Sequence, residues 1–156
     1  MAKVIYTCGP MTGLTPKDAS EWREIVEREL GDAFVVLSPL RVEGALLPKD
    51  EVIGALPDSK EPTLQGAAIY HRDIFDIDRT DILLANLTNV PDGPCIGSVF
   101  EIGYAAALKP KPAIIVVAPA GSVFARHPLI TTPANVVFET LAEAIYHIRH
   151  NFEVFR

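Results

Sequence analysis

Residues 97–108, GSVFEIGYAAAL, are the segment from which the architecture of the chain can be worked out. The segment is rich in alanine, a strong helix former, and it is apolar on nearly every side. Between residues 93 and 108 the only charged side chain is that of Glu101. This pattern predicts a buried helix that starts at Gly97 and Ser98 and carries Glu101 near its first turn.

Two interpretations of Glu101 are open from the helix alone. The unpaired N–H groups and the dipole at a helix start favour a negative charge, so Glu101 could simply complement its own helix. A charge is rarely left among small apolar residues unless something uses it, which favours a functional role. The small glycine and alanine neighbours would also let a flat ligand come close.

Apolar runs that alternate with helical segments extend in both directions from this stretch. Strands are predicted at Val4–Cys8, Ala33–Leu37, Asp81–Leu87, Ala113–Val117 and Asn135–Phe138. Helices are predicted at about 17–30, at Gly66–Arg79 and at Glu139–Arg149. Continuous apolar strands are typical of a parallel sheet that is covered on both faces. The alternation therefore predicts a three-layer α/β fold in which ligands bind beyond the carboxyl ends of the strands.

Residues 38–65 break the alternation. Prolines and glycines are spread along this segment, which predicts a long loop. Loops of this length in a compact domain tend to be lids or binding loops. The loops 9–13, 88–95 and 119–133 are expected at the same end of the sheet, and Glu101 directly follows the second of these three.

Asp73 stands out within the predicted helix Gly66–Arg79. It is spaced i, i+4, i+8 with Ile69 and Ile77, which places it inside the apolar stripe. The charged residues predicted to lie off this stripe are Arg72, Asp76 and Arg79. A buried acid costs stability unless it is paired, and burial favours its protonated form. Asp73 is thus either a catalytic acid or a paired carboxylate that ties the helix to a loop.

Composition limits the classes of function. At 156 residues the chain is long enough for one domain, residues 1–156, with a full hydrophobic core. The net charge of −6 argues against nucleic-acid and anionic-membrane partners. Cys8 and Cys95 show no metal-ligand or disulfide spacing, so we expect both to be reduced and buried, as in a cytoplasmic protein. The start of the chain does not resemble a signal peptide.

Four pieces of the sequence carry a resemblance to a known family. They are Ile5–Pro10 (IYTCGP), Ala68–Asp73 (AIYHRD) continuing to Thr80–Asp81, Phe100–Ala105 (FEIGYA) and Pro133–Val137 (PANVV). In this order they resemble the nucleoside 2-deoxyribosyltransferase family, which includes related 2-deoxynucleoside 5'-phosphate N-hydrolases. Each piece alone is weakly specific, whereas the ordered set spans nearly the whole chain.

The resemblance implies a flavodoxin-like (Rossmann-like) five-stranded parallel sheet and cleavage of the N-glycosidic bond of a 2'-deoxynucleoside. Glu101 would be the nucleophile, Asp73 would protonate the departing base, and Tyr6 would position the Glu101 carboxylate. The physics agrees, because a helix start favours an ionised Glu101 and an apolar stripe a protonated Asp73. Asn135 matches a family residue that reaches into a neighbouring subunit's site. A homo-oligomer built from dimers, up to a hexamer, is therefore expected.

Further residues are expected to bind the nucleoside and the nucleobase. They are Gly9, Pro10, Met11, Asp92, Gly97, Ser98 and Asn135. The family usually has an aspartate or serine six residues before the nucleophile, where this sequence has Cys95; Asp92 or Ser98 could replace it. The resemblance implies no metal and no cofactor.

Three functions remain open. The first is transfer of 2-deoxyribose between bases as part of nucleotide salvage. The second is hydrolysis of the same bond in deoxynucleosides or their 5'-monophosphates, although loop 9–13 lacks the lysine or arginine that would favour a phosphate. The third is a non-catalytic nucleotide-binding module, which would have no need for Tyr6, Asp73 and Glu101 together.

Overall fold

The computed structural model describes residues 1–54, 60–91 and 95–153. Its centre is a sheet of five parallel strands in the order β2-β1-β3-β4-β5. The strands are β1 (Lys3–Cys8), β2 (Phe34–Leu37), β3 (Ile82–Asn86), β4 (Ala113–Val117) and β5 (Val136–Phe138). This strand order is that of flavodoxin-like folds. The prediction of a three-layer α/β fold with a five-stranded parallel sheet is therefore confirmed.

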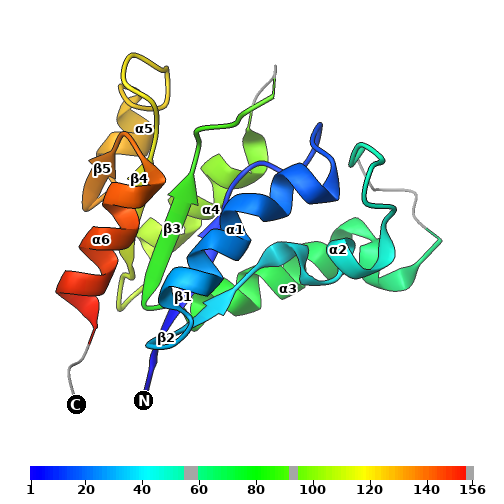
Figure 1. Cartoon of the computed structure of the whole chain (residues 1–156), viewed down its shortest axis with the longest axis horizontal. Helices are drawn as coiled ribbons and strands as arrows, with labels where there is room; N and C mark the ends of the chain where they lie inside the picture. The colour runs from blue at the N-terminus through cyan, green and yellow to red at the C-terminus, as the bar shows by residue number, and fades with distance from the viewer. Residues whose placement is uncertain (55–59, 92–94, 154–156) are drawn as a thin grey trace.

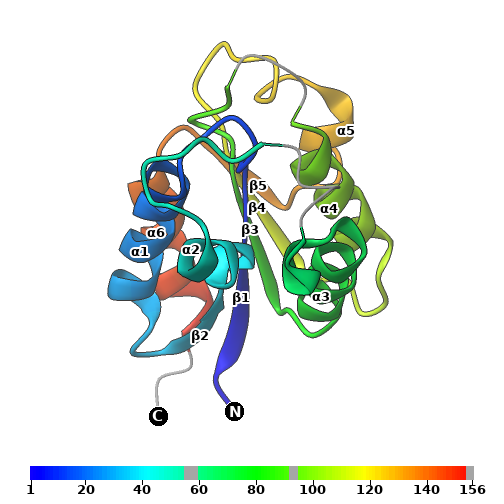
Figure 2. The ribbon, with the colours of Figure 1, turned by 90° about the vertical axis from the view of Figure 1, so that its right-hand side faces the viewer.

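The helices form a layer on each face of the sheet (Figure 1 and Figure 2). Helices α1 (Pro16–Leu30) and α6 (Leu141–Phe152) cover one face. The opposite face is covered by α3 (Gly66–Asp78), α4 (Ile96–Ala107) and the short α5 (Pro128–Thr131). All five strands point the same way, so the loops at their carboxyl ends meet at one edge of the molecule.

Strand β1 sends its side chains alternately to the two layers. Ile5 packs with Val26 of α1, whereas Tyr6 and Cys8 pack with Ile102 of α4, and all five side chains are fully buried. This two-residue period is that of any strand. It directs the Tyr6 side chain towards the helix that carries Glu101.

Local signals in the sequence fix several element ends. Helix α1 begins at Pro16, and the Thr15 hydroxyl accepts a hydrogen bond from the Asp18 N–H, as expected for an N-cap. The predicted helices at 17–30 and 66–79 are confirmed to within a residue. The predicted closing helix starts later, at Leu141, because Thr140 forms a capping box there.

The prediction that residues 38–65 form only loop is wrong in part. The segment contains the short helices η1 (Pro39–Arg41), α2 (Glu43–Leu46) and η2 (Pro62–Leu64). Two of the prolines that we expected to break structure instead begin a helical turn, a position that suits their fixed φ.

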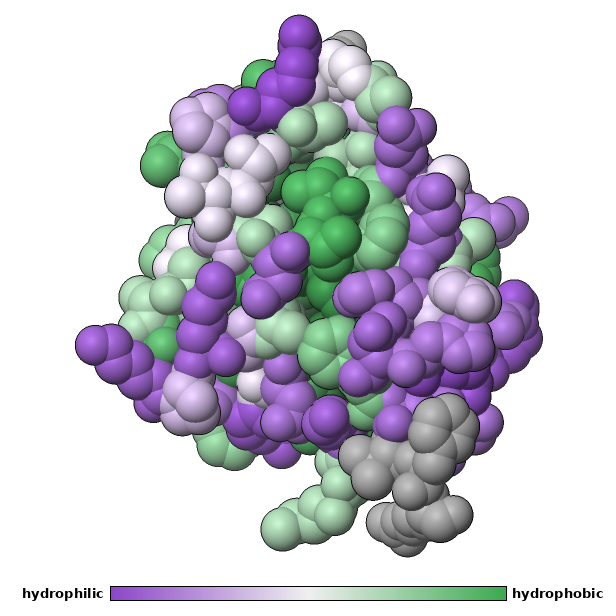
Figure 3. All heavy atoms as spheres, turned by 90° about the vertical axis from the view of Figure 1, so that its left-hand side faces the viewer, coloured by the Kyte–Doolittle hydropathy of each residue, from purple (hydrophilic) through white to green (hydrophobic). Residues whose placement is uncertain are grey.

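The face at the β5 edge of the sheet is seen in Figure 3, where apolar atoms lie between hydrophilic side chains. Strand β5 pairs with β4 on one side, and its three residues are only half-buried. Among the residues that the structure describes, no helix is both long and apolar enough to cross a membrane.

Candidate active site

A cavity of about 500 Å³ lies at the carboxyl ends of β1 and β3, a volume typical of small-molecule sites. Its walls come from the loop after β1, from α3, from the start of α4 and from Pro39. The predicted site residues that line this cleft are Gly9, Pro10, Met11, Asp73, Gly97, Ser98 and Glu101. Segments far apart in the sequence thus meet in one place, as the strand order requires.

Glu101 lies in the second turn of α4. The helix begins at Ile96, one residue before the predicted start, so the expectation that Glu101 lies near the first turn is wrong. The Tyr6 hydroxyl donates a hydrogen bond of 2.7 Å to Glu101 Oε1. The Cys8 thiol also hydrogen-bonds Glu101 and lies 3.7 Å from the carbonyl oxygen of Ser98. Glu101 is therefore held from β1 while one side of it faces the cleft.

Burial raises the pKa of Glu101, and the hydrogen bonds from Cys8 and Tyr6 and the charge of Arg23 oppose this rise. We expected the helix start to keep Glu101 ionised. That reason is wrong, because these neighbouring groups stabilise the carboxylate instead. Burial and the negative charge of Glu101 raise the pKa of Tyr6 far above its usual range, so Tyr6 stays a hydrogen-bond donor.

Asp73 projects from α3 into the same cleft, and only 8% of its surface is exposed. The Arg72 guanidinium lies 3.4 Å from Asp73 Oδ1 and donates a second hydrogen bond of 3.1 Å to the Pro39 carbonyl. Asp73 of α3 and Glu101 of α4 thus line one cavity, whereas Tyr6 of β1 does not line it and contacts Glu101 from the buried side.

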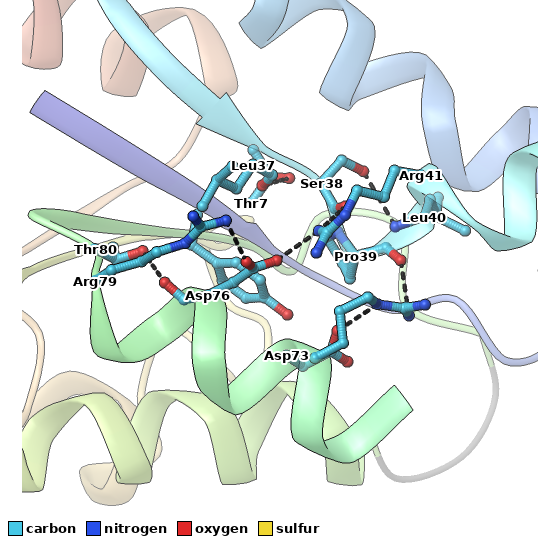
Figure 4. A network of polar contacts seen from close by, with 12 residues as sticks. Thr7, Leu37, Ser38, Pro39, Leu40, Arg41, Asp73, Asp76, Arg79 and Thr80 are labelled. Atoms are coloured by element: carbon cyan, nitrogen blue, oxygen red, sulfur yellow. Dashed lines mark hydrogen bonds and ion pairs between the residues drawn. The ribbon is translucent and has the colours of Figure 1, made fainter. Parts of the chain in front are cut away.

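Asp76 lies one turn after Asp73, and the prediction of its position is wrong. We expected it off the buried stripe, but it is fully buried and ion-paired with Arg41 at 2.5 Å and Arg79 at 2.8 Å (Figure 4). The buried face of α3 is wider than the apolar stripe because η1 packs over it and supplies Arg41. This pair ties the segment that contains Pro39 to the helix that carries Asp73.

The loop after β1 is held closely against its neighbours. A Cβ atom at Gly9 would lie 2.9 Å from the Asn86 carbonyl oxygen and 2.9 Å from the Trp22 ring, so glycine is required there. Gly13 has a φ of +88° and donates its N–H to the Ile53 carbonyl at 2.8 Å. The cleft wall is therefore fixed by backbone contacts.

Other predicted residues lie elsewhere. Asn135 does not line the cleft; its exposed side chain accepts a hydrogen bond of 2.8 Å from the Ile114 N–H near the start of β4. Asp92 lies outside the described residues. Cys95 lines the cleft as the N-cap of α4 and is only partly buried, whereas Cys8 is fully buried. The expectation that both cysteines are buried is therefore wrong for Cys95.

Several cleft residues were not predicted from the sequence. They are Thr12, Gly13, Pro39, Ile69, Val90, Pro91 and Ile96. Most lie in loops without a distinctive pattern. Ile69 could have been found, because it lies one turn before Asp73 on the same stripe.

The strand order defines a flavodoxin-like α/β protein, and two acidic side chains, Asp73 and Glu101, line a cleft at its strand ends. The family model described as nucleoside 2-deoxyribosyltransferase matches residues 5–142, and the chain belongs to this family. No curated protein matches the sequence.

Two solved structures share the fold at low sequence identity. The 2-desoxiribosyltransferase from Leishmania mexicana is similar with a TM-score of 0.64 and 18% identity, over 96% of this chain and 99% of that one. The molybdenum cofactor binding protein from Rippkaea orientalis is similar with a TM-score of 0.56 and 16% identity, over 96% of this chain and 97% of that one. At these identities the likeness concerns the fold alone.

Proposed function

We propose that the protein is a nucleoside 2-deoxyribosyltransferase that moves 2-deoxyribose from one nucleobase to another through a covalent ester at Glu101. The observation that carries this proposal is that Glu101 and Asp73 line one cleft, with the Tyr6 hydroxyl bound to Glu101, within a chain of this family. A reaction of this kind belongs to nucleotide salvage in the cytoplasm.

In the first step Glu101 attacks the anomeric carbon of the bound deoxynucleoside. A bond forms between a Glu101 oxygen and this carbon, while the bond to the base nitrogen breaks and its electron pair goes to the base. Asp73 donates a proton to the base as it leaves. The Arg72 guanidinium 3.4 Å away then stabilises the Asp73 carboxylate that remains.

In the second step an incoming base attacks the same carbon and displaces Glu101. Asp73 takes up the proton that the new base loses, so both residues return to their starting states. Two displacements at one carbon retain its configuration, as in retaining glycosidases. Tyr6 donates its hydrogen bond to Glu101 whenever the carboxylate is free.

The cleft favours a nucleoside over a 5'-monophosphate. In the loop after β1, the Gly13 N–H donates to the Ile53 carbonyl and the Leu14 N–H to the Met11 carbonyl, so neither is available to a phosphate. The sequence of this loop, GPMTG, contains no lysine or arginine. Anion sites at helix starts use free amides or such cations.

We also propose that the active form is a homo-oligomer built from dimers. Asn135 lies near the start of β4, away from the cleft of its own chain, and it immediately precedes β5. The apolar atoms on the face at the β5 edge offer a surface for a second subunit (Figure 3). Asn135 could reach a substrate in that subunit. A fully active monomer in sedimentation and activity measurements would contradict this arrangement.

Incubation with thymidine or deoxyinosine, with and without adenine, tests the proposed activity. We expect chromatography to show deoxyadenosine only when adenine is present. The Glu101→Ala variant should show no base exchange, while its circular dichroism spectrum should match that of the wild type. Free base and deoxyribose alone would identify the hydrolase instead. No product from either donor would leave a nucleotide substrate or a non-catalytic binding module.

A further inference from the structure

Arg23 of α1 is a charged residue buried behind the cleft, with only 3% of its surface exposed. Its Nη2 donates to the Gly9 carbonyl at 3.0 Å and its Nε to the Thr7 carbonyl at 3.4 Å. A further hydrogen bond goes to the Ala19 carbonyl, and the guanidinium lies 4.4 Å from the centre of the Trp22 ring. Arg23 therefore links α1 to the end of β1, where the cleft wall begins.

The surroundings of this cation are unusual. Within the described part of the chain Arg23 forms no ion pair, and its three hydrogen bonds all go to backbone carbonyls. Buried charges are normally paired, because a lone charge loses its hydration. Burial lowers the pKa of Arg23 to about 10, so the guanidinium is still charged at neutral pH. Its charge must be balanced by anions at a greater distance.

The charge of Arg23 acts on the cleft. The titratable groups that surround Glu101 come from β1, α1, α3 and the start of α4, and they are Tyr6, Cys8, Arg23, Asp73 and Cys95. Arg23 is the cation among these five. Its attraction favours the ionised form of Glu101 and opposes the effect of burial.

We infer that Arg23 is a positioning residue, whose buried guanidinium fixes the carbonyls of Thr7 and Gly9 on either side of Cys8 and adds a positive charge behind Glu101. The inference rests on the proposed function of Glu101 as nucleophile. Arg23 does not line the cleft, because it lies on α1, on the opposite face of the sheet from α4.

The test is the titration of Glu101 itself. NMR monitors it in protein labelled with 13C at the glutamate carboxyls, and the Glu101 resonance is assigned by its absence in Glu101→Gln. We expect Arg23→Gln to raise the pH at which Glu101 titrates by about one unit. The acid limb of kcat/KM should move by the same amount, which is about a tenfold loss on that limb. Arg23→Lys keeps the charge and should leave the titration nearly unchanged.

Arg28→Gln is the matched control. Arg28 is on the same helix and loses the same charge, but its side chain is 69% exposed and pairs with Glu29 at the surface. It should shift neither the titration nor the acid limb. An unmoved titration in Arg23→Gln, an equal shift in Arg23→Lys or Arg28→Gln, or a loss of kcat/KM that is uniform across pH would overturn the inference.

A second measurement on the unmutated protein covers the case in which Arg23→Gln does not fold. The Arg23 Nε–H resonance should move with the titration of Glu101 and stay constant over the same pH range in Glu101→Gln. An Arg23 Nε–H chemical shift that does not change as Glu101 titrates would overturn the inference. Neither NMR experiment needs turnover, so failure of the proposed function, seen as full activity in Glu101→Ala, is distinguishable from failure of this inference.

Discussion

Replacing Tyr6 by phenylalanine removes the buried hydroxyl that contacts Glu101 and tests how this carboxylate is kept reactive. The Tyr6 hydroxyl donates to Glu101 Oε1 at 2.7 Å, which is the length of a charge-assisted hydrogen bond. Phenylalanine fills the same buried space, so the change acts on the carboxylate rather than on packing. Because the bond stabilises the ionised form, its loss should raise the pKa of Glu101 further.

The size of the effect follows from the bond. A hydrogen bond to a charged group contributes about 1.5–3 kcal/mol. Since one pKa unit corresponds to about 1.4 kcal/mol, the pKa of Glu101 should rise by about 1–2 units. The rate should therefore fall about tenfold to a hundredfold on the acid limb and recover at higher pH, where Glu101 is ionised again.

The assay is the pH dependence of kcat/KM for base exchange. Tyr104→Phe is the matched control, because its hydroxyl also donates to a carboxylate at 2.7 Å, that of the exposed Asp78. It should leave the profile unchanged. A loss in Tyr6→Phe that is the same at every pH would refute the reasoning, since it would show that Tyr6 does not act through the ionisation of Glu101.

Three further predictions concern stability. Because burial raises the pKa of Glu101, the contribution of Glu101 to the free energy of unfolding is full below the unfolded pKa of 4.5 and is lost as the pH rises through the folded pKa. In urea titrations the stability of Glu101→Gln should therefore increase relative to that of the wild type above pH 4.5. A difference in stability that is constant with pH would contradict this. Asp76→Asn should lower the free energy of unfolding by about 1–3 kcal/mol, since its two arginines are half-exposed, whereas exposed Asp78→Asn should change it by less than about 0.5. Gly9→Ala should lower the free energy of unfolding by about 1–3 kcal/mol in thermal unfolding, whereas Gly103→Ala, at an exposed helical position, should not lower it. Equal melting temperatures of the two variants would argue against the close contacts at Gly9.

The layers of the fold were predictable because each buried strand is a continuous apolar run. The runs ending at Cys8 and Leu87 and the buried helix around Glu101 carry strong, local signals. The parallel order then brings their ends together without any contact being known in advance. The site residues of three segments could thus be assigned to one cleft.

What the sequence did not reveal depends on contacts between distant segments. Asp76 looked like a surface residue because its partner Arg41 lies 35 positions away in a segment predicted to be loop. Arg23 has no distinctive position in the sequence, and only the structure shows its bonds to the end of β1. The ionisation of Glu101 likewise depends on Cys8, Tyr6 and Arg23, which belong to other elements than the helix that carries it.

The proposed reaction requires Glu101 to become covalently bound to the sugar. Its most direct test is mass spectrometry of protein that has been incubated with a deoxynucleoside without an acceptor base and then quenched in acid. We expect a deoxyribosyl adduct on the peptide that contains Glu101, lost on addition of adenine and absent in Glu101→Ala. Turnover by a protein that never carries this adduct, or an adduct on another residue, would contradict the account.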